Sequence, residues 1–190
     1  MGSDEGFEDV VYQPAEDSEL LAEAACREID AGQRVLDVGT GSGYVAARVA
    51  ETGARVIGSD PNPHACRQAR EHGIEVVRTD LVAGFGTEEF DVVLFNPPYL
   101  PTDPESASDD WIGRALSGGE SGRAVVEPFV DSVSRVLRPE GFVLMLVSSL
   151  TGLEEIETQA REASFAVEEV SAESHFFERL VVLKLTAGGE

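Results

Sequence analysis

The sequence predicts an α/β fold built on one open, mostly parallel sheet of seven strands with helices on both faces. Short apolar runs alternate with amphipathic stretches along the chain, which is the order that strand–helix–strand units produce. A glycine-rich turn also follows the first apolar run and leads into a helical pattern. At 190 residues the chain is long enough for a continuous hydrophobic core, and we expect a single domain over residues 1–190.

The first half of the chain holds the clearest patterns. Apolar residues recur at helical spacing over residues 16–29, which predicts a helix there. The apolar run 34–38 predicts a strand that ends in the turn Gly39-Thr40-Gly41-Ser42-Gly43, and a helix is expected over 44–52. Further strands are expected at 55–60, 74–78 and 90–95, with a helix opening at Pro61-Asn62-Pro63.

The second half begins with a change of composition. Residues 101–122 are rich in Asp, Ser, Gly and Pro, and loops of that length are usually functional or disordered. We expect a substrate-side loop there, with Trp111 as part of a lid or, as the less favoured alternative, a surface anchor, and we expect residues 1–10 to be flexible. The elements expected after the loop are helices at 124–137 and 153–163 and strands at 141–148, 165–170 and 176–185, the last two as an antiparallel pair.

Charge is the unusual feature of the composition. The chain has 36 acidic and 14 basic residues, and Lys184 is its only lysine. A nucleic-acid-binding protein normally shows the opposite balance. The scarcity of lysine and the excess of carboxylates resemble proteins of salt-loving archaea, in which high salt screens the repulsion. If the whole proteome is acidic, charge loses force as an argument against nucleic acid.

Other sequence features exclude several classes of protein. No apolar stretch approaches the roughly 20 residues of a membrane span, and the first thirty residues show no signal peptide. We therefore expect a cytoplasmic protein. Cys26 and Cys66 belong to no paired motif, so we expect buried apolar fillers and no metal site.

Acidic residues near the ends of three consecutive predicted strands indicate a cofactor site. The glycine spacing is G-x-G-x-G, not the G-x-G-x-x-G of dinucleotide sites. Asp37 would repel a pyrophosphate but suits the cationic amino group of a methionine moiety. Asp60 is placed to accept from ribose hydroxyls and Asp80 from an adenine amino group. Together they predict a site for S-adenosyl-L-methionine, although each acid alone is more often a cap or a solvated loop residue.

The motif Asn96-Pro97-Pro98-Tyr99 follows the fourth predicted strand and indicates the chemistry. An amide or aromatic amine nitrogen is a poor nucleophile because its lone pair is delocalised. The side-chain oxygen of Asn96 and the carbonyl of Pro97 can accept its two N–H groups and hold it for attack on a sulfonium methyl group, while Tyr99 stacks on the planar group. Catalysis would then rest on positioning and preorganised electrostatics.

These segments together resemble the HemK-type class I methyltransferases. The resemblance lies in Val11-Tyr12-Gln13-Pro14-Ala15-Glu16-Asp17-Ser18, the Asp37 to Gly43 turn, Asp60-Pro61-Asn62-Pro63 and Asn96 to Tyr99. It is strongest for the short archaeal and eukaryotic branch and covers nearly the whole chain. It implies a Rossmann-like class I sheet with an antiparallel last strand. The implied cofactor-binding residues, with their neighbours, are Ser18, Asp37, Gly39, Thr40, Gly41, Asp60, Pro61, Asp80, Leu81 and Asn96; the implied substrate-binding residues are Asn96, Pro97, Pro98 and Tyr99.

The resemblance also implies a substrate and a partner. This branch methylates the glutamine of a Gly-Gly-Gln motif in class I translation release factors. Bacterial members carry an extra N-terminal domain that binds the factor, whereas this chain starts almost directly at Tyr12. Members of the short branch work as heterodimers with a small zinc-binding activator. The strand at 74–78 would be an edge strand and a natural docking site for it.

Three alternatives stay open at the level of the sequence. The same motif can hold the exocyclic amine of a flipped adenine in DNA or RNA, although neither a basic groove nor a target-recognition domain is visible. Protein lysine methylation fits less well, because a deprotonated amine is tetrahedral. A non-catalytic scaffold is disfavoured by the intact Asp37, Asp60 and Asn96.

Overall fold

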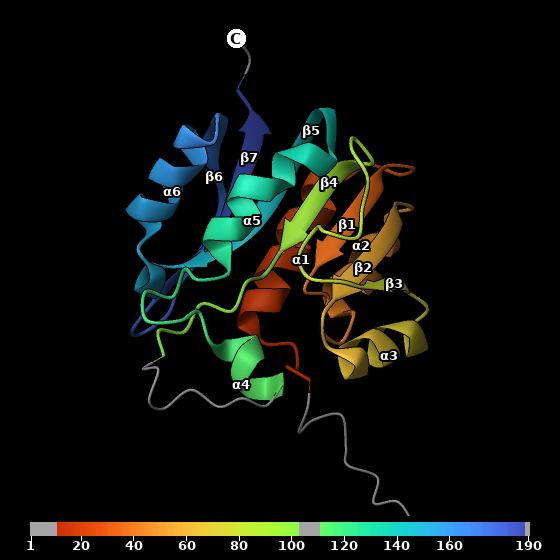
Figure 1. The fold of residues 1–190 in the computed structure, drawn as a ribbon, viewed down its shortest axis with the longest axis horizontal. Helices are drawn as coiled ribbons and strands as arrows, with labels where there is room; N and C mark the ends of the chain where they lie inside the picture. The colour runs from red at the N-terminus through yellow and green to blue at the C-terminus, as the bar shows by residue number, and fades with distance from the viewer. Residues whose placement is uncertain (1–10, 103–110, 189–190) are drawn as a thin grey trace, which may run out of the picture.

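The fold is an open α/β sandwich around a seven-stranded sheet (Figure 1). The computed structural model describes residues 11–102 and 111–188. The strands lie in the order β3-β2-β1-β4-β5-β7-β6, and all neighbours are parallel except the pairs that β7 makes with β5 and β6. The strands are β1 (Arg34–Val38), β2 (Arg55–Asp60), β3 (Glu75–Arg78), β4 (Phe90–Phe95), β5 (Leu137–Ser148), β6 (Phe165–Ser174) and β7 (Arg179–Ala187). The predicted sheet, with its antiparallel last strand, is confirmed.

Helices cover both faces of the sheet. They are α1 (Glu16–Glu28), α2 (Tyr44–Ala50), α3 (Pro63–Glu71), α4 (Trp111–Leu116), α5 (Val126–Val133) and α6 (Leu153–Glu162). The α1 and α2 helices pack on one face, and α5 and α6 on the other, in front of the sheet in Figure 1. Because side chains alternate along a strand, successive residues of β4 contribute to different clusters: Val92 packs with α1, and Val93 packs with α5.

The order of strands creates the position of the site. The chain leaves β1 towards β2 on one side, and later crosses to β4 on the other side. In open α/β sheets, ligands bind outside the carboxyl ends of the strands at such a switch point. The turn after β1, the end of β2 and the segment after β4 therefore converge at one edge of the sheet.

Several predicted bounds were wrong by a few residues. The helix expected over 44–52 ends at Ala50, and that expected over 124–137 ends at Val133 and continues as a 3-10 turn to Val136. The strand expected over 141–148 begins already at Leu137. A proline at 139 disfavours helical backbone in the residue before it, so the chain turns extended there.

The largest error concerns the last strand, which was expected over 176–185. Phe176 and Phe177 do not belong to it: β6 extends to Ser174, and β7 begins at Arg179. The two aromatic residues lie in the connecting turn instead. Apolar aromatic residues favour strands locally, and only the pairing of β6 with β7 places them at the turn.

The predicted loop over 101–122 contains the short helix α4, which begins at Trp111. Part of that loop, and the segment 1–10 expected to be flexible, lie outside the described residues. Cys66 is buried, Cys26 is half-buried, and both are free thiols. Within residues 11–102 and 111–188, no helix is long and apolar enough to cross a membrane.

Candidate active site

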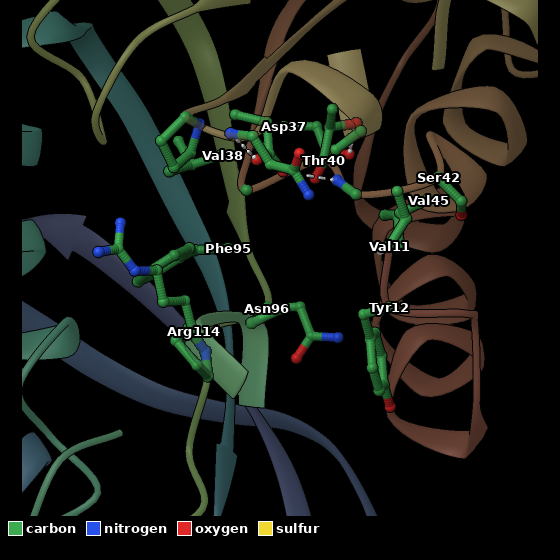
Figure 2. Close-up of a pocket in the computed structure, with 18 of the residues that line it drawn as sticks. Val11, Tyr12, Asp37, Val38, Thr40, Ser42, Val45, Phe95, Asn96 and Arg114 are labelled. Carbon is green, nitrogen blue, oxygen red and sulfur yellow. Dashed lines mark hydrogen bonds between the residues drawn. The ribbon is translucent and has the colours of Figure 1, made fainter. Parts of the chain in front are cut away.

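A cavity of about 530 Å³ lies at the carboxyl ends of β1, β2 and β4. Its volume falls in the range of roughly 300–1,000 Å³ that small-molecule sites occupy. Figure 2 shows Asp37 and Thr40 on one side of the cavity, Tyr12 and Val45 on another, and Asn96 between them. All of the residues predicted to bind the cofactor line it: Ser18, Asp37, Gly39, Thr40, Gly41, Asp60, Pro61, Asp80, Leu81 and Asn96.

Asp37 is a buried carboxylate in this cavity. It is 3% exposed, and its Oδ2 accepts a hydrogen bond from the Thr40 hydroxyl at 2.7 Å. Burial raises its pKa to about 7, while the bonds from Thr40 and from the backbone of Ala46 lower it and the charge of Asp60 raises it further. A buried carboxyl group whose pKa lies near 7 is suited to a cationic ligand, which would favour its charged form.

Asp60 is oriented by the glycine-rich turn. Its carboxylate accepts the backbone N–H groups of Gly41 at 3.0 Å and Asn62 at 2.8 Å. Burial raises its pKa, and these two bonds oppose the rise. The turn itself needs glycine, because Gly39 and Gly41 adopt φ values of +65° and +54°. A Cβ at Gly39 would meet nothing within 4 Å, so this backbone borders open space that a ligand can enter.

The amide nitrogen of Asn96 makes hydrogen bonds, whereas its amide oxygen makes none within the described residues. Its Nδ2 donates to Asp17 Oδ2 at 3.2 Å and to Ser18 Oγ at 3.4 Å. A carboxylate only accepts, so Asp17 fixes which end of the amide faces it. Among the residues that the structure describes, no group bonds the buried Oδ1 of Asn96. Figure 2 shows the amide nitrogen on the side of Tyr12 and the oxygen turned away. A buried acceptor without a partner is costly, and this oxygen is the natural place for a ligand N–H.

A second cavity of about 150 Å³ continues from Asn96. It contains Pro97 and Tyr99, the two substrate-side residues that do not line the larger cavity, while Pro98 lines both. Burial, more than the charge of Asp17, raises the pKa of Tyr99 above its ordinary value. Its phenol therefore stays protonated and can stack or donate, but cannot serve as a base. The predicted motif is thus divided between the two cavities.

Sequence reasoning missed Asp17, which organises this region. Asp17 accepts from the Tyr12 hydroxyl at 3.1 Å as well as from Asn96, and it is 3% exposed. An acidic residue in the first turn of a helix is commonly explained by the helix dipole alone, so its pattern gave no sign of this role. Trp111, expected to belong to a lid, lines the larger cavity, and the guanidinium of Arg114 lies 5.7 Å from the centre of its ring.

The observed groups fit S-adenosylmethionine. A buried acid suits its ammonium group, the oriented Asp60 suits a ribose, and the glycine backbone leaves room for close approach. The fold and the site thus define a class I S-adenosylmethionine-dependent methyltransferase. In agreement, residues 35–116 match the model of a methyltransferase domain family. Within the described residues no group of three His, Cys, Asp or Glu side chains could hold a metal ion.

Comparison with known proteins gives the family. The chain is 36% identical to a Methanocaldococcus jannaschii protein named for a protein N5-glutamine methyltransferase activity, over 91% of this chain and 90% of that protein. It is 35% identical to the human methyltransferase HEMK2, over 93% of this chain and 89% of that protein. The chain therefore belongs to the HemK-type protein glutamine methyltransferases, in their archaeal and eukaryotic branch, and is an S-adenosylmethionine-dependent enzyme.

A solved structure agrees with this assignment. The Mtq2–Trm112 complex of E. cuniculi, responsible for methylation of the eRF1 translation termination factor, matches with a TM-score of 0.79 at 29% identity. The match covers 94% of this chain and 99% of that chain. A bacterial ribosomal protein L11 methylase from Lactobacillus delbrueckii matches with a TM-score of 0.68 at 18% identity, which shows the shared fold alone.

Proposed function

We propose that this enzyme methylates the side-chain amide of the glutamine in the Gly-Gly-Gln motif of a class I translation release factor. The observation that carries the proposal is the buried, unbonded Oδ1 of Asn96, a residue that lines both cavities. Relatives named for glutamine methylation and the complex that methylates eRF1 support the choice of substrate. A cytoplasmic location, where translation takes place, is part of the proposal.

The proposed role of the motif is to hold a planar nitrogen. Asn96 Oδ1 accepts one N–H of the glutamine amide, and the carbonyl of Pro97 accepts the other. Tyr99 stacks against the amide plane, and its raised pKa keeps the phenol neutral. Asp17 keeps the Asn96 amide turned so that Oδ1 is available. Positioned acceptors of this kind stabilise charge as it develops on the nitrogen.

The larger cavity is the proposed cofactor site. When bound there, S-adenosylmethionine supplies an activated methyl group on a sulfonium. We assign its ammonium group to Asp37, its ribose hydroxyls to Asp60 and its adenine amino group to Asp80, all of which line the cavity. The glycine turn, Gly39 to Gly41, lets the ligand approach the backbone closely. Leu81 and Pro61 form an apolar part of the cavity wall. The assignment treats residues 1–190 as one catalytic domain.

Incubation with labelled cofactor tests the substrate. A release factor carrying Gly-Gly-Gln is expected to be labelled, and a Gly-Gly-Ala version is not. The Asn96→Ala enzyme serves as the control for background labelling. Equal labelling of the two factors would refute the glutamine assignment and leave the methyltransferase class intact. Labelling of adenine in nucleic acid, but of neither factor, would favour the alternative.

We also propose a small zinc-binding activator as partner, docked along β3. This strand is at one edge of the sheet, where among residues 11–102 and 111–188 it pairs with β2 alone, and its Val77 is 38% exposed. A free strand edge can accept another strand. The Mtq2–Trm112 complex supports a partner of this kind.

Hydrogen exchange with and without the activator tests this docking. The amides of β3 are expected to become protected when the activator binds, because its strand would cover them. The β6 strand, at the opposite edge, is the internal control and should not change. Protection of β6 with no change in β3 would show that the activator docks at the opposite edge of the sheet, and the proposed docking along β3 would be wrong.

A further inference from the structure

Two phenylalanines in the turn between β6 and β7 are almost fully in solvent. Phe176 is 92% exposed and Phe177 is 85% exposed, and their ring centroids lie 4.7 Å apart in an edge-to-face contact. No other large apolar side chain in residues 11–102 and 111–188 is more than 47% exposed. Aromatic side chains carry the largest apolar area and are enriched where proteins meet. This pair, called the aromatic turn below, is therefore a candidate contact surface.

Hydrogen bonds close the aromatic turn and anchor it to its neighbours. The backbone N–H of His175 donates to the carbonyl of Glu178 at 2.8 Å, which closes the turn. The Glu178 carboxylate accepts from the Ser148 hydroxyl at 2.7 Å, and the N–H of Arg179 donates to the Ser149 hydroxyl at 2.9 Å. The β7 side of the turn is thus tied to the carboxyl end of β5. A preorganised surface loses less entropy on binding.

The aromatic turn lies at the same edge of the sheet as the active site. The β6 strand runs in the same direction as β4 and β5, because β7 is antiparallel to both of its neighbours. Its end therefore lies on the side where β4 delivers Asn96, as Figure 1 shows for the lower end of the sheet. Tyr99 packs against the core cluster that contains Leu180, two residues beyond Glu178. Burial and the charge of Asp17 are the larger causes of the raised pKa of Tyr99, and the charge of Glu178 raises it further.

The surroundings of the aromatic turn are mainly acidic, because the nearby Arg179 is paired with Glu169. His175 Nδ1 lies 3.2 Å from Glu16, whose side chain is 72% exposed, and Glu173 beside it is 53% exposed. The whole chain carries a net charge of −22. A partner for this surface therefore needs an apolar hollow for the rings and basic side chains around it, since like charges oppose association.

Resting on the proposed function, we propose that the aromatic turn is a docking surface for the protein substrate, which receives Phe176 and Phe177 in an apolar hollow bordered by Lys and Arg. His175 of the turn contacts Glu16, which directly precedes Asp17 of the smaller cavity, so one substrate domain can touch both while its glutamine enters beside Asn96. The activator is the poorer occupant, because β3 lies at the far end of the strand order from β7 and β6. An acidic rim also repels anionic membranes.

Steady-state kinetics of the activator complex test the proposal. The double variant Phe176→Ser/Phe177→Ser is compared with the parent and with the control Phe176→Leu/Phe177→Leu, which keeps an apolar surface. The substrates are the whole release factor and a short peptide that contains Gly-Gly-Gln. For the whole factor, the serine variant is expected to raise KM at least about tenfold with kcat unchanged, as truncation of buried aromatic anchors does. The leucine variant is expected to raise it about threefold or less, and cofactor affinity and peptide kinetics stay constant.

Each other outcome counts against the docking surface. Equal KM values of the parent and the serine variant for the whole factor would overturn it. An equal loss with the peptide, or weaker cofactor binding, would also overturn it, because the effect would then arise in the cavities. Sedimentation of a parent dimer that the serine variant abolishes would assign the surface to a second copy. If the parent labels no release factor at all, the proposed function fails first, which is distinguishable from a failure of docking alone.

Discussion

Replacing Asp37 by asparagine is expected to stabilise the ligand-free protein and to abolish cofactor binding. Burial raises the pKa of this carboxyl to about 7 from its ordinary 3.8. The folded state therefore holds the proton more tightly than the unfolded chain does, and folding is opposed wherever the unfolded chain has lost that proton. Asparagine has nearly the same shape and carries no charge to bury. Its amide oxygen can accept the backbone N–H of Ala46 while its amide nitrogen donates to the Thr40 hydroxyl, which can accept as well as donate.

The size of the effect follows from the pKa values. The destabilisation by Asp37 begins near pH 3.8, grows as the pH rises, and levels off above about pH 7. At 1.36 kcal/mol per unit it amounts to about 2 kcal/mol at pH 5 and about 4 kcal/mol at pH 8. The advantage of the variant should therefore grow by about 2 kcal/mol across this interval. The residue is 3% exposed, so solvent screening reduces these values little.

Urea unfolding of the parent and Asp37→Asn proteins at several pH values, in concentrated KCl without ligand, measures the difference. Global charge effects largely cancel between the two proteins. Asp91→Asn is the matched control with the opposite sign. Although burial works against it, bonds from the Arg34 backbone and from Arg138 lower the pKa of Asp91. Its charge stabilises the fold above its ordinary pKa, so the Asp91 variant should be less stable from pH 5 to 8, by a nearly constant amount.

Calorimetric titration with S-adenosylmethionine completes the test. The parent is expected to bind and Asp37→Asn is not, since the ammonium group of the ligand loses its counter-charge. A stability difference that does not change between pH 5 and 8 would refute the reasoning, because Asp37 would then titrate at the same pH in the folded and unfolded chains. Binding of the cofactor by the variant at the affinity of the parent would refute the assigned role.

Three further outcomes are expected. Asn96→Ala should lower kcat about a hundredfold or more, the scale for one oriented catalytic group, with a much smaller loss of cofactor affinity by titration; an unchanged kcat would remove Asn96 from the mechanism. Asp17→Ala should lower kcat about tenfold or more, because a hydrogen bond to a charged group is lost and only Ser18 still orients the Asn96 amide; rapid-quench single turnovers would show whether the chemical step is affected, and an unaffected step would sink this positioning role. Thermal unfolding should occur at higher temperature as KCl rises from about 0.1 to 2 M, because screening relieves the repulsion of a net charge of −22; a salt-independent midpoint would contradict this.

The fold was predictable because buried parallel strands appear in the sequence as short apolar runs. The continuous apolar runs before Asp37, Asp60 and Asn96 correspond to β1, β2 and β4. In parallel sheets the carboxyl ends of such strands share one edge. That rule alone brings together side chains that are up to 59 positions apart, as Asp37 and Asn96 are in the sequence.

Other features depend on contacts between distant segments. The first turn of α1 gives no local sign that Asp17 reaches Asn96, 79 residues away. The pair Phe176 and Phe177 has strong strand propensity, yet the register between β6 and β7 places both in the turn. Local propensity is weaker than the sum of the hydrogen bonds and buried contacts that fix a strand register.

The sequence by itself determined the alternation of strands and helices, the glycine turn, the acids at the strand ends and the Asn96 motif, because each is a local pattern with a local physical cause. The tertiary structure alone decided which end of the Asn96 amide is free, how far burial raises the pKa of Asp37, and that the exposed aromatic turn lies at the edge of the sheet that carries the active site. These properties depend on what surrounds a side chain in space, and the surroundings come from elements far away in the chain.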